Sequence, residues 1–361
     1  CVLISALVSL ATGSSWSTSA TIGIALIGIG KALGLPVGMV AGAVISGAYF
    51  GDKLSPLSDT TNLASAMSGG ELFSHIRYML YTTLPSIGIT LLVFVFLGLG
   101  FSTDGTVDTS LLSESIGEKF NISPWLFLVP LGVILMIVKK TPPLLALFVG
   151  TLLGGVFALI FQPQLLLELS GRNVLDTSAI YQTILNAITV DTQIETSDPL
   201  LNELFSSGGM QGMLGTVWLI ICAMVFGGVM DAIGALQAIS NAFLKWAQTT
   251  FQLIAGTAAS SLTVNLTASD QYLAIVVPGK MFAQAYRNRK LAPENLSRTL
   301  EDAGTVTSVL VPWNTCGAYQ SGVLGVGVAE YFIYAIFNWI SPITTLVYAF
   351  FKIKIKKLKV D

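Results

Sequence analysis

Long apolar runs follow one another along this chain, and short polar segments interrupt them. About 20 apolar residues in a helix cross the roughly 30 Å of hydrocarbon in a bilayer, so runs near this length predict spanning helices. Such runs lie at residues 35–57, 81–101, 123–138, 142–161, 214–233 and 329–351. Two further regions, 1–33 and 251–286, carry a polar island between two shorter apolar arms. A re-entrant hairpin with its polar tip buried among other helices fits these two regions better than a simple crossing.

The polar segments form two similar pairs. The island TGSSWSTSAT (12–21) precedes GDKLSPLSDTTN (51–62), and the island TVNLTASDQ (263–271) precedes EDAGTVTSVLVPWNTC (301–316). The second member of each pair contains acids, hydroxyls and a proline, and a proline inside a membrane helix kinks or unwinds it. The order of island, apolar run, acidic broken helix and apolar run thus occurs twice. This order predicts the internal repeat of a secondary transporter.

The composition places the chain in a membrane. Apolar residues make up 53% of its 361 residues and charged residues 11%, against roughly 25% charged in soluble domains. The mean hydropathy is +0.75, and there are 35 glycines. We therefore predict an all-α integral membrane protein. The net charge of −2 gives no basis for binding nucleic acid.

The basic residues predict the orientation, because Lys and Arg concentrate in cytoplasmic loops. The basic segments are Lys139 with Lys140, Lys245, residues 287–298, the tail 352–361, and residues 71–80, a predicted short surface helix that carries His75 and Arg77. The acid-rich segments 102–122 and 162–210 are predicted to lie outside, the latter with short surface helices. With these sides fixed, the first hairpin enters from outside and the second from the cytoplasm, which is an inverted repeat.

The repeat divides the chain into unequal units. Residues 1–101 form the first, with hairpin, broken helix and closing span, and an external loop, 102–122, follows. Residues 123–351 form the second unit, with a polar external insertion at 162–210, and residues 352–361 form a basic cytoplasmic tail. The second unit has three spans before its hairpin and the first has none. We therefore expect three further spans before Cys1 in a longer protein.

The chemistry of the polar segments favours exchange of Na⁺ for H⁺. A carboxylate in a dehydrated cavity holds a proton near neutral pH, and an arriving cation expels that proton. One site that binds either ion and faces alternate sides gives antiport. Asp52, Asp59, Asp270 and Asp302 are the candidate carboxylates, and Asp59 and Asp302 are the preferred Na⁺ ligands. Neighbouring oxygens that complete the shell come from Ser15, Ser17, Thr60, Asn62, Asn265, Ser269, Thr305, Asn314 and Thr315.

Several alternatives stay open at this point. Lys53 is a structural partner for Asp52 in one interpretation, and the Ser-rich island serves close helix packing in another. Asp231 is either an acid within the membrane or a residue at the exit of its span. The sequence predicts no cofactor beyond the transported ions.

The motifs resemble those of a known family. TGSSWSTSATIGIALIGIG, GAVISGAYFGDKLSPLSDTTNLA and HIRYMLYTTLPS, with TASDQYLAIVVPGKMF and LSRTLEDAGTVTSVLVPWNTCGAY further on, are similar to the NhaC-type sodium/proton antiporters. The resemblance covers nearly the whole chain. It implies a multi-pass transporter of the plasma membrane with two inverted units, two hairpins, and Na⁺ and H⁺ as coupled ions. Members similar to malate–lactate antiporters imply an alternative, a Na⁺- or H⁺-coupled carrier of a small organic acid or an amino acid.

Two other classes fit the sequence less well. The polar islands are irregular and do not match the rings that line a channel. The sequence has no HExxH, GxSxG or Walker motif, so we do not expect an enzyme. A homodimer is expected as an assembly of this architecture.

Overall fold

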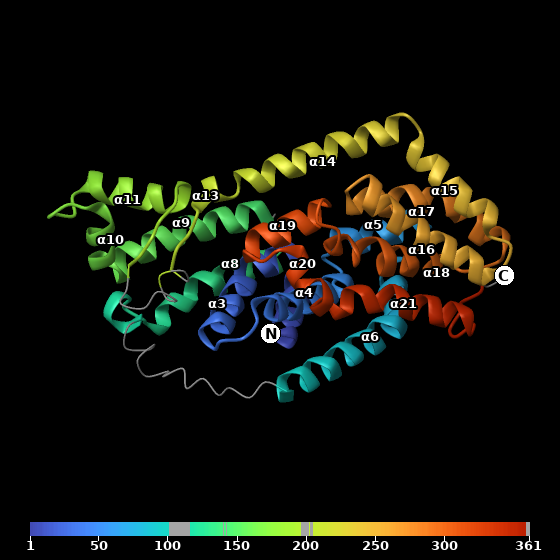
Figure 1. Ribbon diagram of the computed structural model, residues 1–361, viewed down its shortest axis with the longest axis horizontal. Coiled ribbons are helices and arrows are strands. Elements are labelled where there is room, and N and C mark those ends of the chain that lie inside the picture. The colour runs from blue at the N-terminus through green and yellow to red at the C-terminus, as the bar shows by residue number, and fades with distance from the viewer. Residues whose placement is uncertain (101–115, 140, 142, 196–201, 203–204, 359–361) are drawn as a thin grey trace. The chain divides into compact units, whose positions relative to one another are not determined.

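The computed structural model describes residues 1–100, 116–139, 141, 143–195, 202 and 205–358 (Figure 1). Most of the predicted external loop 102–122 lies outside this range. The described residues form helices and connecting turns, with two isolated β-bridges, Thr192 to Ser207 and Leu291 to Lys357, and no strand. The prediction of an all-α protein is confirmed. The chain forms two compact units, one of residues 1–27, 36–101 and 216–361 and one of residues 28–35 and 102–215.

The larger unit contains both polar pairs. Its first part has α1 (Val2–Thr12), α2 (Ser15–Thr18), the π-helical turn η1 (Ser19–Gly23), the start of α3 (Ile24–Ala32), α4 (Val37–Leu54), α5 (Asp59–Ser68) and α6 (Leu72–Gly100). Its second part has α14 (Leu214–Ala232), α15 (Ala235–Trp246), α16 (Thr250–Thr267), α17 (Gln271–Asn288), α18 (Pro293–Leu300), the π-helical turn η3 (Glu301–Thr305), η4 (Ser308–Leu310), α19 (Thr315–Leu324), α20 (Val328–Tyr331), η5 (Phe332–Tyr334) and α21 (Ile336–Phe350).

The smaller unit contains η2 (Pro124–Phe127), α8 (Leu128–Val138), α9 (Pro143–Phe161), α10 (Pro163–Ser170), α11 (Thr177–Thr189) and α13 (Gly209–Gly212). The short helices expected in residues 162–210 are thus present as α10 and α11. Asn121 anchors the turn after α9, because its main chain exchanges two hydrogen bonds of 2.9 Å with the amide of Gln162.

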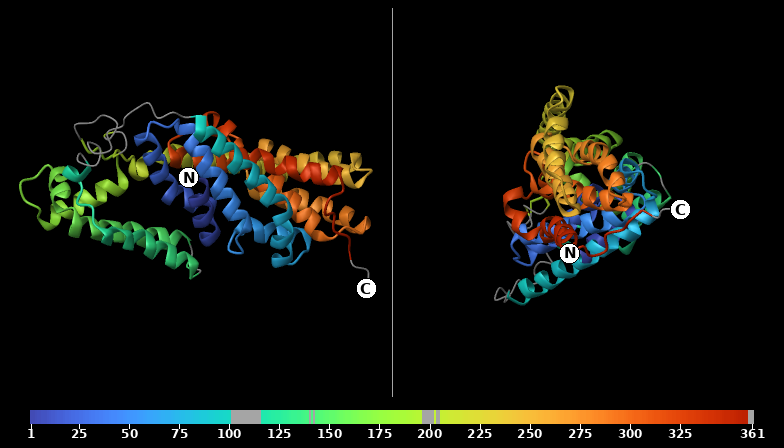
Figure 2. Two further views of the ribbon diagram at one scale, coloured as in Figure 1. Left: turned by 90° about the horizontal axis from the view of Figure 1, so that it is seen from below. Right: turned by 90° about the vertical axis from the view of Figure 1, so that its right-hand side faces the viewer.

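Helix α4 lies at the centre of the larger unit (Figures 1 and 2). It packs on α1 along one side and on α20, η5 and α21 along another, and nearly all of its residues are buried. Glycines permit this close packing. A Cβ at Gly47 would stand 2.2 Å from the carbonyl oxygen of Val2, and one at Gly51 would stand 2.3 Å from that of Ala6. Small residues one turn apart bring helix backbones together in this way in membrane proteins.

Both predicted breaks in the first half are present. α1 ends at Gly13, whose φ of 70° is the left-handed conformation that glycine adopts without strain. Ser14 then caps α2 by accepting a hydrogen bond from the Ser17 amide. The second break separates α4 from α5, and its Leu57 lies so close to Gly13 that a Cβ there would be 2.6 Å from the Leu57 Cβ. The two breaks therefore pack against each other.

The second half has the same kind of contact. Helices α16 and α17, both orange in Figures 1 and 2, pack on each other as the arms of the expected hairpin. Ser269 sits in the break between them with a φ of 60°. Its carbonyl accepts a 2.9 Å hydrogen bond from the amide of Thr315, the first residue of α19. The hairpin break thus meets the break before α19.

Two helices among the described residues are long and apolar enough to cross a membrane, α6 and α14. The pairs α9–α10, bent by 99°, and α20–α21, bent by 52°, give two more if each counts as one crossing. The predicted final span at 329–351 is therefore bent, with a break at Ala335 between η5 and α21. Its break lies next to α4, where a Cβ on Gly42 would stand 2.4 Å from the Tyr334 main chain, so close packing accompanies the bend.

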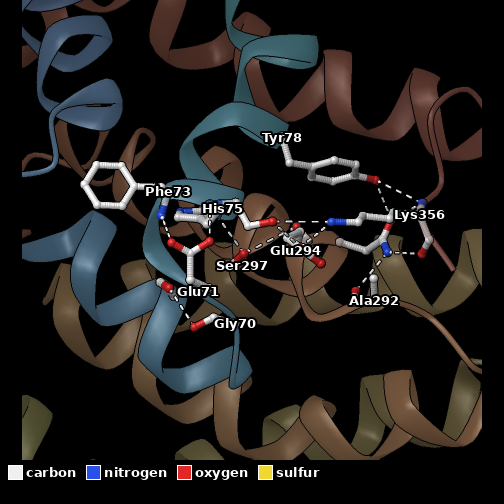
Figure 3. A network of polar contacts seen from close by, with 12 residues as sticks. Gly70, Glu71, Phe73, His75, Tyr78, Ala292, Glu294, Ser297 and Lys356 are labelled. Atoms are coloured by element: carbon white, nitrogen blue, oxygen red, sulfur yellow. Dashed lines mark hydrogen bonds and ion pairs between the residues drawn. The ribbon is translucent and has the colours of Figure 1, made fainter. Parts of the chain in front are cut away.

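The prediction of a surface helix at residues 71–80 is wrong. Residues 71–80 do not form a separate surface helix, because α6 runs without interruption from Leu72 to Gly100. His75 is fully buried, and its Nδ1 lies 2.7 Å from the hydroxyl of Ser297 on α18 (Figure 3). α18 packs on this end of α6 and covers the histidine.

Candidate functional site

A buried ion pair lies at the centre of the larger unit. Lys53, in the last turn of α4, pairs through its Nζ with the carboxylate of Asp302 in η3, and neither side chain is exposed. The Lys53 Nζ also lies 3.2 Å from the Ser341 hydroxyl and 5.7 Å from the centre of the Phe337 ring. A buried charge is costly unless it is paired and hydrogen-bonded, so each of the two charges requires the other.

Three hydroxyls complete the surroundings of Asp302. Ser341 donates to Oδ1 at 2.8 Å, Thr82 donates to Oδ2 at 3.0 Å, and Thr345 also donates to Oδ2. They come from α6 and α21, which pack along each other. Asp302 is therefore surrounded by oxygen atoms and one ammonium group. Carboxylate and hydroxyl oxygens of this kind are the ligands of a hard cation such as Na⁺.

Glu301 is the second acid of the centre, and no pattern in the sequence singled it out. It is fully buried, and neither of its carboxyl oxygens has a hydrogen-bond partner among the described residues. The Thr305 hydroxyl, predicted as a ligand, is also buried without a partner there. Two acids and an unpaired hydroxyl thus lie in one π-helical turn.

The first pair of breaks brings Ser15 and Asp52 together. Ser15 donates from its amide at 3.0 Å and from its hydroxyl at 2.7 Å to Oδ2 of Asp52. Oδ1 of Asp52 has no partner among the described residues, although it is buried. Ser17 is buried next to these residues in α2. This carboxylate has room for a further donor or a cation on one oxygen.

Asp59 and Asn62 lie at the start of α5 and are exposed. The Asp59 Oδ2 accepts a 2.5 Å hydrogen bond from the hydroxyl of Tyr272 on α17. Asn62 donates to the carbonyl oxygens of Pro56 and Ser58 at 3.0 and 2.6 Å. Thr60 is buried between them, 3.2 Å from the Ser58 hydroxyl. Asp59 therefore differs from Asp302, because solvent reaches it.

The second pair of breaks is held by two asparagines. Asn265 donates at 2.6 Å to the carbonyl of Gly304 in η3, and Asn314 donates at 3.2 Å to the side-chain oxygen of Asn265. Asp270, which is only partly buried, caps α17 by accepting from the Leu273 amide at 2.9 Å. Ser269 and Thr315 join the breaks through the main chain, as described above. These residues connect the hairpin to the π-helical turn of Asp302.

The structure corrects the interpretation that Lys53 is a structural partner of Asp52. Lys53 pairs with Asp302 and not with its neighbour Asp52. Adjacent residues on a helix point about 100° apart, so Asp52 and Lys53 face different neighbours. The sequence offered one signal that Lys53 needs a distant partner, since it is the only basic residue in residues 35–62 and lies just after the uncharged apolar run 35–50. Thr82, Ser341 and Thr345 had no signal, because hydroxyls are common along both of their helices.

Broken helices that meet around buried acids, a buried lysine and hydroxyl oxygens define a membrane transporter for small cations. Among the described residues, no three His, Cys, Asp or Glu side chains gather as a metal centre. Residues 47–353 match the sequence profile of the Na⁺/H⁺ antiporter family. The chain belongs to this family of secondary active transporters and is not an enzyme.

Relatives extend the match over almost the whole chain. It is 38% identical over 356 residues to the Na⁺/H⁺ antiporter NhaC of Alkalihalophilus pseudofirmus, covering 99% of this chain and 74% of that protein. It is also 38% identical to NhaC of Bacillus subtilis, with 98% and 74% covered. The malate-2H⁺/Na⁺-lactate antiporter of B. subtilis is 35% identical, with 94% and 69% covered. No solved structure matches the chain.

Proposed function

We propose that the chain exchanges Na⁺ for H⁺ at Asp302, with Lys53 as the group that Na⁺ displaces. The ion pair between these two side chains is the observation that carries this proposal, because it is fully buried and already sits among three hydroxyl oxygens. A sodium ion that takes the place of the ammonium group finds carboxylate and hydroxyl ligands in position.

Displacement couples the two ions. When Na⁺ occupies Asp302, the contacts that remain to the Lys53 ammonium among the described residues are the Ser341 hydroxyl and the Phe337 ring. An unpaired ammonium is costly in such surroundings, so Lys53 loses its proton as the sodium ion arrives. Release of Na⁺ on the other side restores the proton and the ion pair. Na⁺ and the proton thus exclude each other from the site, and this exclusion produces antiport.

Glu301 provides a second exchangeable position. Its buried carboxyl has no hydrogen-bond partner among the described residues, and such an acid is neutralised by whichever cation reaches it, a proton or a sodium ion. We propose that Glu301 exchanges a further proton during the cycle, since it lies next to Asp302 in the same turn.

Asp59 is proposed to capture Na⁺ from solvent. It is exposed and lies two residues before Thr61, whose hydroxyl donates at 3.1 Å to the Lys53 carbonyl. Through Thr61, the start of α5 that carries Asp59 is therefore hydrogen-bonded to Lys53, the basic member of the ion pair. Asp52, Asn265 and Asn314 stabilise the helix breaks next to this site through the hydrogen bonds described above.

The orientation proposed from the basic residues places the tail after Phe351 in the cytoplasm. Lysines 352, 354, 356 and 357 follow α21 directly, and basic residues next to a membrane helix remain on the cytoplasmic side. The membrane is then the plasma membrane, with the two acid-rich segments outside.

Transport in liposomes tests the central proposal. The purified protein is reconstituted with a pH-sensitive dye inside, and Na⁺ is added outside. We expect Na⁺ to release protons in the wild-type protein and to have no effect in Asp302→Asn or Lys53→Gln. Exchange at the wild-type rate in either variant would remove that residue from the coupling role.

A carrier of an organic acid is the second candidate function. A pocket of about 470 Å³ lies at the second hairpin break and is lined by Leu266, Thr267, Ser269 and Trp313 together with side chains of α14. This volume suits a small organic acid, and one relative is named for malate and lactate. Sodium flux that requires malate or lactate in the same liposomes would select this function over simple exchange.

A further inference from the structure

A second pocket, of about 400 Å³, lies between the start of α6 and the chain that follows α21. Its lining includes Ser74, Arg77, Tyr78, Tyr81, Lys354 and Lys356. It shares no residue with the ion pair or with the hairpin breaks. Three of these side chains are basic and two are tyrosines. Whether the pocket favours an anion depends on how many of the basic groups are already neutralised by acids.

The charges of the pocket do not cancel. Lys356 pairs with Glu294 at 2.5 Å, and this is the one ion pair that the lining residues make within the described chain. Arg77 and Lys354 are exposed and form no such pair there. Behind Tyr78, the guanidinium of Arg298 lies 4.6 Å from the ring centre, fully buried and without a hydrogen-bond partner among the described residues. Three cations thus line the pocket, a fourth lies behind Tyr78, and one of the lining cations has a carboxylate partner among the described residues.

The pocket lies where two helices change from apolar to basic surface. On α6, a series of exposed apolar side chains runs from Leu84, about two turns after Arg77, to Leu99, and Phe73 is exposed on the other side of Arg77. On the other side, Phe350 and Phe351 are exposed at the end of α21, just before the lysines. Tyr81, with the Lys354 ammonium 4.9 Å from its ring centre, lies at the boundary. Tyrosines and basic residues occupy this level at a membrane surface.

The wall formed by the tail is fixed in place. The Lys356 carbonyl accepts hydrogen bonds from the Ala292 amide at 3.0 Å and from the Asn295 side chain at 2.6 Å. The Leu358 amide donates to the Lys290 carbonyl at 2.9 Å. The Tyr78 hydroxyl lies within hydrogen-bond distance of the Lys354 carbonyl and of the Asn295 side-chain oxygen, and Figure 3 shows Tyr78, Lys356 and Glu294 in one network. The pocket is therefore built from ordered chain on both sides.

We propose that this pocket binds a phosphate-bearing anion at the membrane surface. Arg77 and Lys354 hold the phosphate oxygens, and Tyr81 contacts the group next to the phosphate. The headgroup of an anionic phospholipid has this chemistry at this depth, and free phosphate has the same chemistry in solution. A bound anion would join the tail to α6 beside α18, the helix that leads into Glu301 and Asp302.

Binding of short-chain phospholipids to the purified, delipidated protein in detergent tests this proposal. The measurement is the shift of Tm on titration with dihexanoyl phosphatidylglycerol, dihexanoyl phosphatidylcholine or inorganic phosphate. We expect phosphatidylglycerol to bind about tenfold more tightly than phosphatidylcholine. Arg77→Gln and Lys354→Gln should each weaken that binding about fivefold, the effect of removing one basic residue at an anionic surface.

Lys352→Gln is the matched control, because Lys352 is an exposed tail lysine with the same left-handed backbone as Lys354 but does not line the pocket. We expect its binding constant to stay within about twofold of the wild-type value. If inorganic phosphate alone shifts Tm and displaces phosphatidylglycerol, a free anion is the source. If it does not, a lipid is the source. Equal binding of the two lipids, or an equal loss in Lys352→Gln and Lys354→Gln, would overturn the pocket as an anion site.

Discussion

Lys53 and Asp302 are 249 residues apart in the sequence and form an ion pair that solvent does not reach. The pair joins the last turn of α4 to the π-helical turn after α18. Each half of the chain therefore supplies one charge of the buried pair. Either half alone would have to bury an unpaired charge, which is energetically costly.

A double-mutant cycle on this pair separates folding from transport. Lys53→Gln and Asp302→Asn should each destabilise the protein by about 3–5 kcal/mol, because each leaves one buried charge without its partner. The double variant should recover part of this loss, since it leaves no charge unpaired, and should still not transport. Unfolding in detergent measures the stabilities and the dye assay measures transport. Strictly additive losses would show that the two charges do not interact.

Glu301→Gln should keep the fold and change the ion ratio. The glutamine has the same size and cannot take up a proton, while the wild-type side chain has no hydrogen bond to lose among the described residues. We expect Tm to stay near the wild-type value and the number of protons moved per Na⁺ to fall. Parallel measurement of labelled Na⁺ uptake and dye-reported proton flux gives this ratio. An unchanged ratio would assign Glu301 to structure alone.

Asp59→Asn should weaken Na⁺ capture without abolishing exchange. Its carboxylate is exposed and accepts from the Tyr272 hydroxyl and the Thr60 amide among the described residues, so loss of its charge should raise KM for Na⁺ several-fold and leave kcat within about twofold. Tyr272→Phe is the control, since it removes the same hydrogen bond and keeps the charge. A complete loss of exchange in Asp59→Asn would place the coupling step at this residue.

Gly51→Ala should destabilise the packing of α1 on α4. The added Cβ would lie 2.3 Å from the Ala6 carbonyl oxygen, and relief of such overpacking costs about 1–3 kcal/mol. Gly88→Ala in α6 is the matched control, because no atom lies within 4 Å of its added Cβ. In that position alanine should be neutral or stabilising, as alanine favours helices over glycine. Equal Tm values for the two variants would contradict the close packing.

Docking of the tail should depend on pH through Glu294. Burial opposes ionisation of this carboxyl, but hydrogen bonds from Lys356, the Glu294 amide and Ser74 outweigh it and lower its pKa below the ordinary 4.5. A depressed pKa stabilises the docked state above pH 4.5, and this contribution disappears as the pH falls through the lower folded value. The protection of the Ala292 and Leu358 amides, measured against their intrinsic exchange rates at each pH, should therefore fall below that pH.

Variants of Lys356 and Lys357 provide the controls for this pH prediction. Lys356→Gln should accelerate the same exchange already at neutral pH, because Glu294 then lacks its charged partner. Lys357→Gln should not, since the ion pair of Glu294 is with Lys356. Protection that is independent of pH in the wild-type protein would contradict a role of Glu294 in docking the tail.

The sequence predicted the helical class and the breaks at the polar segments, because Pro56 and the hydroxyl-rich segments act locally. It did not predict the partner of Lys53, since pairing across 249 residues depends on how α4 and α18 pack. Glu301 was missed because its neighbour Asp302 already accounted for the acidic start of the segment. His75 was assigned to a surface because the short helix around it was amphipathic, and only the packing of α18 shows that it is buried.

The π-helical turn at Glu301–Thr305 changes the phase of its helix. Such a turn contains one residue more than an α-helical turn, and each residue rotates a helix by about 100°. Side chains before and after the turn are therefore offset from the positions that a continuous α-helix would give. If α18 and this turn are treated as one regular α-helix, in a comparison of structures or in a design, the wrong side chain is placed opposite Lys53. If the π-helical turn began one residue earlier or later in the chain, the helix would rotate Asp302 away from Lys53.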